Sequence, residues 1–573
     1  MAHLCRTFNM YLRTTLTVPC LALLSSSVLG IGLQQSALMR EFQLAAELGL
    51  DPSRYLNDRS AFHNLISHGP KKEPTFPAEY VEIPIDHYNL SVGTYPNRFW
   101  VNEQYFVPGG PIILYDVGEA NAQSIAQTHL SSNLSFFGEL LQDFKAMGIV
   151  WEHRYYGESC PFPVHNDTPA EHLKYLNTDQ ALQDIPHFAK TFSRLSHSEI
   201  DLTPRSTPWV MVGCSYAGNR AALTRNEYPD TIFAAFASSA PVQARVDMSM
   251  YWDQVYRGMV YNGLGNCTKD LNAALKFIDH QLADPQTSAW VKRLFLGPGA
   301  DQNSNEDFTS ALTSLFGFFQ SSGTAGTSTG SLEEFCNYLE VDPKTKQTAG
   351  PQGLAPTHGS RYIAERWASW PMFIPLVNLN SGTNCNKTDH SLPLSCALDQ
   401  PITKPDSISW SWQYCTEWGF FQSNNFGPHS LLSRYQTLEY QQEVCNRQFP
   451  GMLPLHPQAE ALNEQFGGWD IRPPNVYFSG GEFDPWRTLS TLSSEHIAPQ
   501  DMTWSSEIPK CGVTQDETIF GHVLPNSMHC FDFQILSTPG KTSRALFTTA
   551  LREWLQCFQQ RGLGGESDEN DEK

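Results

Sequence analysis

Ser215 stands in a stretch whose residue types and spacing fit nucleophilic catalysis. It is the third residue of Gly-Cys-Ser-Tyr-Ala-Gly (213–218), which follows the apolar run 209–212 and precedes a helix-like stretch. A sharp strand-to-helix turn of this kind tolerates only small residues two positions before and after the serine, where Gly213 and Ala217 stand. We predict a nucleophile elbow that presents the Ser215 hydroxyl at a helix N-terminus, where backbone amides favour a developing oxyanion.

A nucleophilic serine needs a general base, and the base needs a carboxylate that orients it. Asp484 and His529 each lie in a loop directly after an apolar strand, which gives the chain order Ser, Asp, His. We therefore predict that these residues complete a triad with Ser215. The rivals that are less well placed are Glu482 beside Asp484, Asp470 before the strand, and His522 inside a strand-like run.

Two backbone amides should stabilise the oxyanion. The Tyr216 amide, directly after the nucleophile, is the first, and the loop after the apolar run 111–115 should supply the second. Gly118 in that loop would allow a close backbone approach. The neighbouring Glu119 is either a substrate-binding residue or a solvated loop acid, and the sequence leaves this open.

The elements that must position these residues alternate between strands and helices. Strand-like runs at 111–115, 148–151, 209–212 and 232–236 are separated by helical stretches, which is typical of a mostly parallel α/β sheet. The alternation stops near residue 244 and resumes near 476. We predict an α/β-hydrolase sheet with a large inserted, mainly helical cap domain, divided as follows: signal peptide 1–30, N-terminal arm or propeptide 31–75, hydrolase domain 76–243 and 466–561, cap 244–465, and disordered acidic tail 562–573.

Composition and the N-terminus indicate a secreted protein. The 573 residues carry a formal net charge of −21, which argues against nucleic acid or an anionic membrane surface as a partner. The weakly apolar run 16–32 follows Arg6 and Arg13 and is typical of a cleaved signal peptide. No other run approaches a membrane span, so we expect no membrane anchor. We expect no metal or other cofactor and leave open a homodimer.

Cysteines and glycosylation motifs agree with secretion. Thirteen cysteines less two in the signal peptide leave eleven, an odd number that predicts disulfides plus one free thiol. Local spacing pairs Cys267 with Cys336, Cys385 with Cys396 and Cys415 with Cys445, and we take Cys214 as the free thiol. Asn-X-Ser/Thr motifs permit glycosylation at Asn89, Asn133, Asn166, Asn266 and Asn386.

Several segments, in the same order along the chain, resemble one family of serine peptidases. The sequence is similar to the proline-cleaving peptidases that include lysosomal Pro-X carboxypeptidase, lysosomal dipeptidyl peptidase, thymus-specific serine protease and fungal acid prolyl endoproteases. Residues 152–157 (EHRYYG) and 484–486 (DPW) are the most specific matches. The others are 109–112, 118–119, 173–182, 213–218, 415–417 and 529–530.

The resemblance implies a serine peptidase that cleaves on the carboxyl side of proline, in a secreted or acidic lysosome- or vacuole-like setting. Its substrates would be peptides or proteins that contain proline. It places the nucleophile, aspartate and histidine at Ser215, Asp484 and His529. It leads us to expect Trp486, Glu417 and Trp418 near the substrate, with Trp410 and Trp412 as further pocket walls. An esterase or lipase on the same fold is the alternative, because an elbow does not itself choose between peptide and ester.

Overall fold

The computed structural model describes residues 31–56, 75–131, 135–514 and 518–563. The predicted signal peptide, most of the acidic tail and part of the predicted arm lie outside these residues. Within them, one sheet of nine strands joins segments from both ends of the chain, in the order β1-β2-β4-β3-β5-β6-β9-β11-β10. The strands are β1 (Glu79–Pro84), β2 (Thr94–Asn102), β3 (Ile112–Asp116), β4 (Met147–Trp151), β5 (Trp209–Cys214), β6 (Ala234–Ser238), β9 (Val476–Gly481), β10 (Thr503–Ser505) and β11 (Thr518–Leu524).

The sheet is parallel from β4 to β10, whereas β2 pairs antiparallel with both β1 and β4. Side chains alternate along each strand, so Ile112 and Leu114 face one core while Ile113 and Tyr115 face the other. Helices cover both faces, as a parallel sheet requires. One face is covered by α6 (Thr178–Ala189) and α7 (Tyr216–Glu227), and the other by α3 (Gln123–Leu130), α4 (Phe136–Asp143) and α20 (Thr538–Leu563). The predicted α/β-hydrolase sheet is confirmed.

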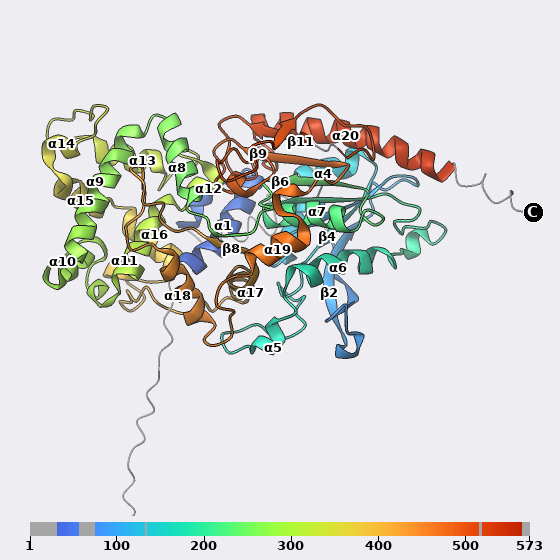
Figure 1. The fold of residues 1–573 in the computed structure, drawn as a ribbon, viewed down its shortest axis with the longest axis horizontal. Coiled ribbons are helices and arrows are strands. Elements are labelled where there is room, and N and C mark those ends of the chain that lie inside the picture. Colours follow the sequence, from blue (N-terminus) through green and yellow to red (C-terminus); the bar gives the residue numbers. More distant parts are fainter. Residues whose placement is uncertain (1–30, 57–74, 132–134, 515–517, 564–573) are drawn as a thin grey trace, which may run out of the picture.

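A second, mainly helical part lies between β6 and β9 in the chain and beside the sheet in space (Figure 1). It also holds the short pair β7 (Arg245–Asp247) and β8 (Gly419–Phe421). We call this part the cap. Its helices are α8 (Met250–Tyr261), α9 (Gly265–Leu282), α10 (Pro285–Leu296), α11 (Asn305–Leu312), α12 (Phe319–Ser322), α13 (Leu332–Glu340), α14 (Ala355–His358), α15 (Ser360–Ala368), α16 (Phe373–Ser381), α17 (Pro405–Gln413), α18 (Leu438–Gln448) and α19 (Ala459–Phe466).

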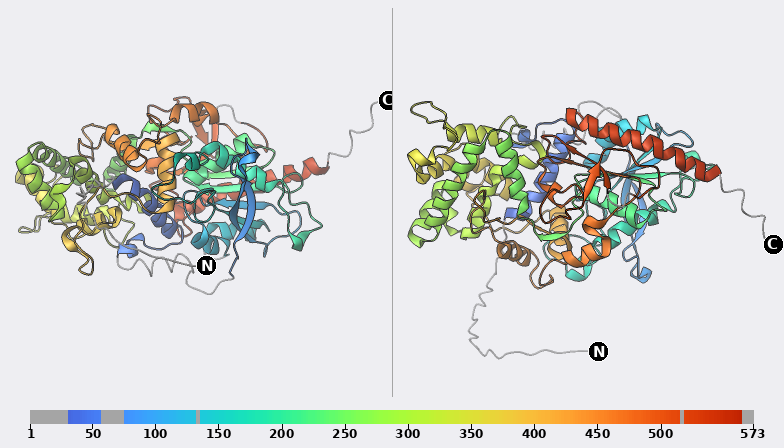
Figure 2. Two further views of the ribbon diagram at one scale, coloured as in Figure 1. Left: turned by 90° about the horizontal axis from the view of Figure 1, so that it is seen from below. Right: turned by 45° about the horizontal axis from the view of Figure 1, so that its top comes forward.

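The N-terminal arm forms a helix, α1 (Ile31–Glu47), that lies between the cap and the sheet. Both further views agree with this placement (Figure 2). The helix contacts α11, α12, α16 and α17, and its side chains Phe42 and Ala45 are fully buried. Within the described ranges, the remaining α-helix is the short α5 (Ala170–Leu173). Among the described residues, no helix combines the length and apolar character that crossing a bilayer requires.

Candidate active site

The nucleophile elbow forms as the sequence predicts, between β5 and α7. Ser215 has φ 64° and ψ −130°, a strained conformation for a residue with a side chain. The turn is so tight that a Cβ on Gly213 would lie 2.3 Å from the Ala217 carbonyl oxygen. A Cβ on Gly218 would lie 2.5 Å from the carbonyl oxygen of Ser238 in the adjacent strand. The small residues around Ser215 are therefore required by close backbone packing.

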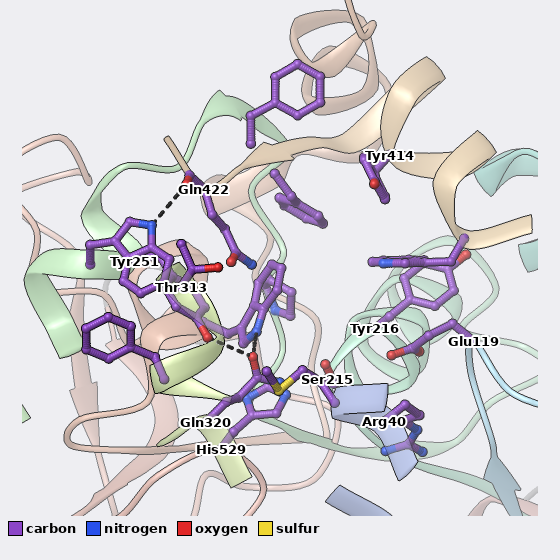
Figure 3. Close-up of a pocket in the computed structure, with 18 of the residues that line it drawn as sticks. Arg40, Glu119, Ser215, Tyr216, Tyr251, Thr313, Gln320, Tyr414, Gln422 and His529 are labelled. Atoms are coloured by element: carbon purple, nitrogen blue, oxygen red, sulfur yellow. Dashed lines mark hydrogen bonds between the residues drawn. The ribbon is translucent and has the colours of Figure 1, made fainter. Parts of the chain in front are cut away.

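His529 and Asp484 meet at the end of the sheet near the elbow. The His529 Nδ1 lies 2.9 and 3.0 Å from the two carboxylate oxygens of Asp484, and both side chains are buried. Asp484 also accepts from the Trp486 amide, and the His529 amide donates to the Gln320 carbonyl. The other imidazole nitrogen, Nε2, has no hydrogen-bond partner. The His529 ring lines the same pocket as Ser215 (Figure 3).

The three rival side chains lie elsewhere. Glu482 accepts a hydrogen bond from the Asn526 amide at 2.8 Å, and Asp470 is exposed. His522 is half-buried within β11, with Ser506 beside its ring. Of the acids considered from sequence, Asp484 is the one that the structure places against His529.

The predicted oxyanion donors differ in their surroundings. Tyr216 is the first residue of α7, and the first amides of a helix have no partner within it. Gly118 approaches the elbow, since a Cβ added to it would lie 3.2 Å from the Ala217 Cβ. Its amide, however, donates to Asp116 Oδ1 at 2.9 Å. A role for Gly118 as the second donor therefore stays a prediction.

The pocket around Ser215 has an aromatic wall supplied by the cap and by the Asp484 loop. Trp486 lies against His529, with ring centroids 6.4 Å apart, and its indole nitrogen donates to Gln320. The rings of Phe420 and Tyr251 pack edge-on against Trp486. Further residues of the lining are Trp252, Phe316, Trp410, Tyr414 and Phe421. Together they form a rigid apolar surface beside the reacting groups.

Glu119 lies in the pocket near Ser215 (Figure 3). Burial raises the pKa of its carboxyl, and the nearby Arg40 cation opposes that shift. Its Oε2 has no hydrogen-bond partner. The location fits the substrate-facing alternative for Glu119 better than a solvated loop acid.

Glu417 and Trp418 are not part of the pocket lining. Glu417 accepts hydrogen bonds from the amide and hydroxyl of Thr178, at 3.0 and 2.9 Å, and so joins the cap to the start of α6. Trp418 is buried against Tyr216 and Phe420. Both residues lie behind the residues that line the pocket. This geometry does not favour contact between either of them and a substrate, and such contact stays a prediction.

The half-buried Glu417 should make the protein more stable in mild acid than at neutral pH. Burial raises its pKa from 4.5 to about 7. The folded state then holds a proton that the unfolded state releases between these values, so the free energy of unfolding falls as pH rises through this window. When the pH is raised from about 5 to about 7.5, we expect the melting temperature of Glu417→Gln to fall less than that of the wild type. Exposed Glu460→Gln is the control, and equal losses in all three proteins would contradict the assignment.

Helix α1 contributes a wall of the pocket that the sequence did not predict. Met39, Arg40 and Gln43 line the same cavity as Ser215 and His529. Arg40 Nη2 donates to the Val117 carbonyl at 3.0 Å, which joins the helix to the loop that carries Glu119. The apolar spacing of the arm indicates a helix with a buried face. No local signal indicates which part of the molecule that face covers.

The disulfide pattern confirms three predicted pairs and corrects one prediction. Cys267–Cys336, Cys385–Cys396 and Cys415–Cys445 form as expected. The expectation that Cys214 is unpaired is wrong, because it is bonded to Cys530, and Cys160 is the free cysteine among the described residues. A fifth bond joins Cys511 to Cys557. Local spacing could not reveal the Cys214–Cys530 bond, whose partners are 316 residues apart.

The Cys214–Cys530 disulfide joins the residue before Ser215 to the residue after His529. We expect its removal in Cys214→Ala/Cys530→Ala to lower kcat by about 10- to 100-fold with little change in KM, because small displacements of reacting groups are costly. Removal of the cap disulfide in Cys267→Ala/Cys336→Ala is the matched control. Steady-state kinetics at a temperature where both variants stay folded makes the comparison. An undiminished kcat in the first variant would show that packing alone positions the two residues.

The predicted glycosylation sites differ in exposure. Asn89, Asn166 and Asn386 are exposed, and Asn133 lies outside the described residues. Asn266 is half-buried, and its amide nitrogen donates to Glu340 at 3.0 Å. Since a glycan would occupy that nitrogen, Asn266 is the least accessible of the four described sites.

Comparison with known proteins identifies the family. The model of the family described as serine carboxypeptidase S28 matches residues 83–500. A probable extracellular serine carboxypeptidase of Arthroderma benhamiae is 27% identical over 74% of this chain, and the match spans 60% of that longer protein. Lysosomal Pro-X carboxypeptidase of Bos taurus is 25% identical, over 84% of this chain and 88% of its own.

A solved structure of a Mycobacterium smegmatis proline iminopeptidase aligns with 84% of this chain and 100% of its own, at 12% identity and a TM-score of 0.30. The family model covers well over half of the chain, including Ser215 and Asp484. The sequence resemblance is thereby confirmed: the chain belongs to the serine carboxypeptidase S28 family and is a serine-type peptidase.

Proposed function

We propose that this chain is a secreted serine peptidase that hydrolyses peptide bonds on the carboxyl side of proline through Ser215, Asp484 and His529. The observation that carries the proposal is the pocket that is lined both by the strained Ser215 and by a histidine held by a buried aspartate. Family membership favours a peptide over the ester or lipid that the same fold could hydrolyse.

Each residue has a defined role in the proposed reaction. His529 Nε2 removes the proton of the Ser215 hydroxyl as its oxygen attacks the carbonyl carbon of the scissile bond. Asp484, bound to Nδ1, orients the ring and stabilises its cationic form. The Tyr216 amide donates to the oxyanion. His529 then protonates the leaving amine, and a water molecule, activated by the same nitrogen, releases the acyl group from Ser215.

Proline specificity is supported by the wall formed by Trp486, Phe420 and Tyr251. Proline presents a compact apolar ring without an N–H, so a rigid aromatic surface can select it by shape and burial. The edge-on packing of Phe420 and Tyr251 leaves the Trp486 ring few alternative positions. The bovine relative is named a Pro-X carboxypeptidase.

Paired peptides that differ only in the residue before the scissile bond test this specificity. We expect kcat/KM to be about 10- to 200-fold higher with proline than with alanine, the range that shape selection in an apolar pocket provides. Trp486→Ala should reduce that ratio, whereas Trp412→Ala, a buried tryptophan outside the pocket lining, should leave it unchanged. Equal kcat/KM for proline and alanine in the wild type would contradict the proposed specificity.

We also propose an acidic extracellular or lysosome-like setting. The relatives are named as extracellular and lysosomal peptidases. Burial raises the pKa of Glu340 to about 8 and that of Glu417 to about 7, and both carboxyls then stabilise the fold in mild acid.

A further inference from the structure

One face of helix α1 is turned toward the pocket and is held there firmly. Gln43 lies three residues after Arg40 and four after Met39, the spacings of neighbours on a helix surface. Next to this face, Phe42 packs against Phe318 of the cap, with ring centroids 4.8 Å apart. Arg40 ties the helix to the Val117 carbonyl. The face is therefore a fixed wall of the site, and it precedes the stretch that the family model matches.

Gln43 is the unusual residue of this wall. Its side chain is 1% exposed, yet neither its amide oxygen nor its amide nitrogen has a hydrogen-bond partner. A buried polar group left unpaired costs about 1–3 kcal/mol, so native proteins rarely keep one without a reason. An amide with both ends unpaired, at a pocket that holds a nucleophile, points to a ligand that supplies both an acceptor and a donor.

Three other polar side chains of the pocket already have hydrogen-bond partners or counter-charges. The Gln320 side-chain oxygen accepts from Tyr251 and Trp486. The Gln436 amide nitrogen donates to the Glu306 carbonyl and to Thr309. Arg40 carries a charge, but Glu47 lies 3.7 Å away and Glu119 is near, so its cation is balanced within the protein. Gln43 remains as a neutral group that both accepts and donates.

We propose that Gln43 binds the main chain of the peptide substrate, accepting from one backbone N–H and donating to one backbone carbonyl. A peptide presents these two groups in alternation, and they match the two ends of a carboxamide. The proposal rests on the proposed peptidase function and adds to it a binding residue from the N-terminal arm. It also makes the arm part of the working enzyme rather than a removable propeptide.

Gln43→Met tests the proposal, because methionine has a similar length and no amide. We expect kcat/KM for a proline-containing peptide to fall by about 10- to 100-fold, roughly one decade for each lost hydrogen bond. Labelling of Ser215 by a small fluorophosphonate, which has no peptide group, should keep its rate within about twofold. The melting temperature should stay equal or rise, because Gln43 has no partner in the protein to lose.

Gln448→Met is the matched control. Gln448 is also buried, but its amide is bonded to Ile402 and Asn166 and lies outside the pocket lining. We expect this variant to lose melting temperature and to keep the wild-type ratio of peptide cleavage to labelling. Gln43→Met would overturn the proposal if it kept peptide cleavage within about twofold, or if cleavage and labelling fell in proportion. A wild type that is labelled but cleaves no peptide would instead refute the proposed function, and this inference with it.

Discussion

Ser215→Ala is expected to lower kcat on a proline-containing peptide by about a millionfold, the loss that accompanies removal of the nucleophile from a serine-protease triad. The side chain contributes only its hydroxyl to the elbow, and alanine is still smaller than serine. The strained backbone at this position is held by the neighbouring strands, since the Ser215 amide donates to the Ser238 carbonyl. The variant should therefore fold, with a melting temperature close to that of the wild type.

The measurement needs a probe that separates Ser215 from the other serines. A fluorophosphonate should label the wild type at Ser215, as peptide mass spectrometry can establish, and should not label the alanine variant. Ser239→Ala, which alters a buried serine of the adjacent loop, is a useful comparison because Ser239 accepts from the Cys530 amide. Retention of more than about a tenth of wild-type kcat by purified Ser215→Ala would refute the nucleophile assignment.

Asp484→Asn should have the next largest effect, a fall in kcat of about 10⁴-fold. An asparagine in this position can present its NH2 group to His529 Nδ1. The imidazole would then carry its proton on Nε2, the nitrogen that must accept the Ser215 proton, and would be the wrong tautomer for a general base. The carboxylate charge that stabilises the imidazolium is lost as well. The Trp486 amide can still donate to the side-chain oxygen at residue 484, so the loop should keep its shape.

Two comparisons make the aspartate experiment specific. Asp470→Asn changes an exposed acid near the same strand and should leave kcat unchanged. Glu482→Gln changes the neighbouring acid that bonds to the Asn526 amide, and it should have a small effect. If Glu482→Gln lowered kcat more than Asp484→Asn does, Glu482 rather than Asp484 would be the carboxylate that orients His529.

Short-range patterns explain why much of the fold was predictable. The alternation of apolar runs with helical spacing predicted the parallel sheet, and small residues at fixed distances from Ser215 predicted the elbow. The chain order of Ser215, Asp484 and His529 led to a carboxylate and an imidazole that the structure places in contact. These features depend on a few neighbouring residues, or on the rule that loops at the ends of parallel strands share one edge of a sheet.

Features that depend on packing between distant segments were not predictable. From the sequence, we expected Glu417 and Trp418 to contact the substrate. In the structure they lie behind the pocket lining, where Glu417 bonds to Thr178 and Trp418 packs against Tyr216. Only the folded chain showed that Cys214 and Cys530 are close enough to bond.

By itself, the sequence determined the hydrolase fold, the elbow and the candidate triad, because these follow from local periodicity, turn sterics and strand order. The tertiary structure decided which segments complete the pocket: the cap's aromatic wall, the disulfide beside the reacting residues, and helix α1 with Gln43. Burial of an apolar helix face is favourable against any complementary surface, so periodicity predicts that the face is covered without predicting its partner. That partner is set by the shapes of the sheet and the cap together.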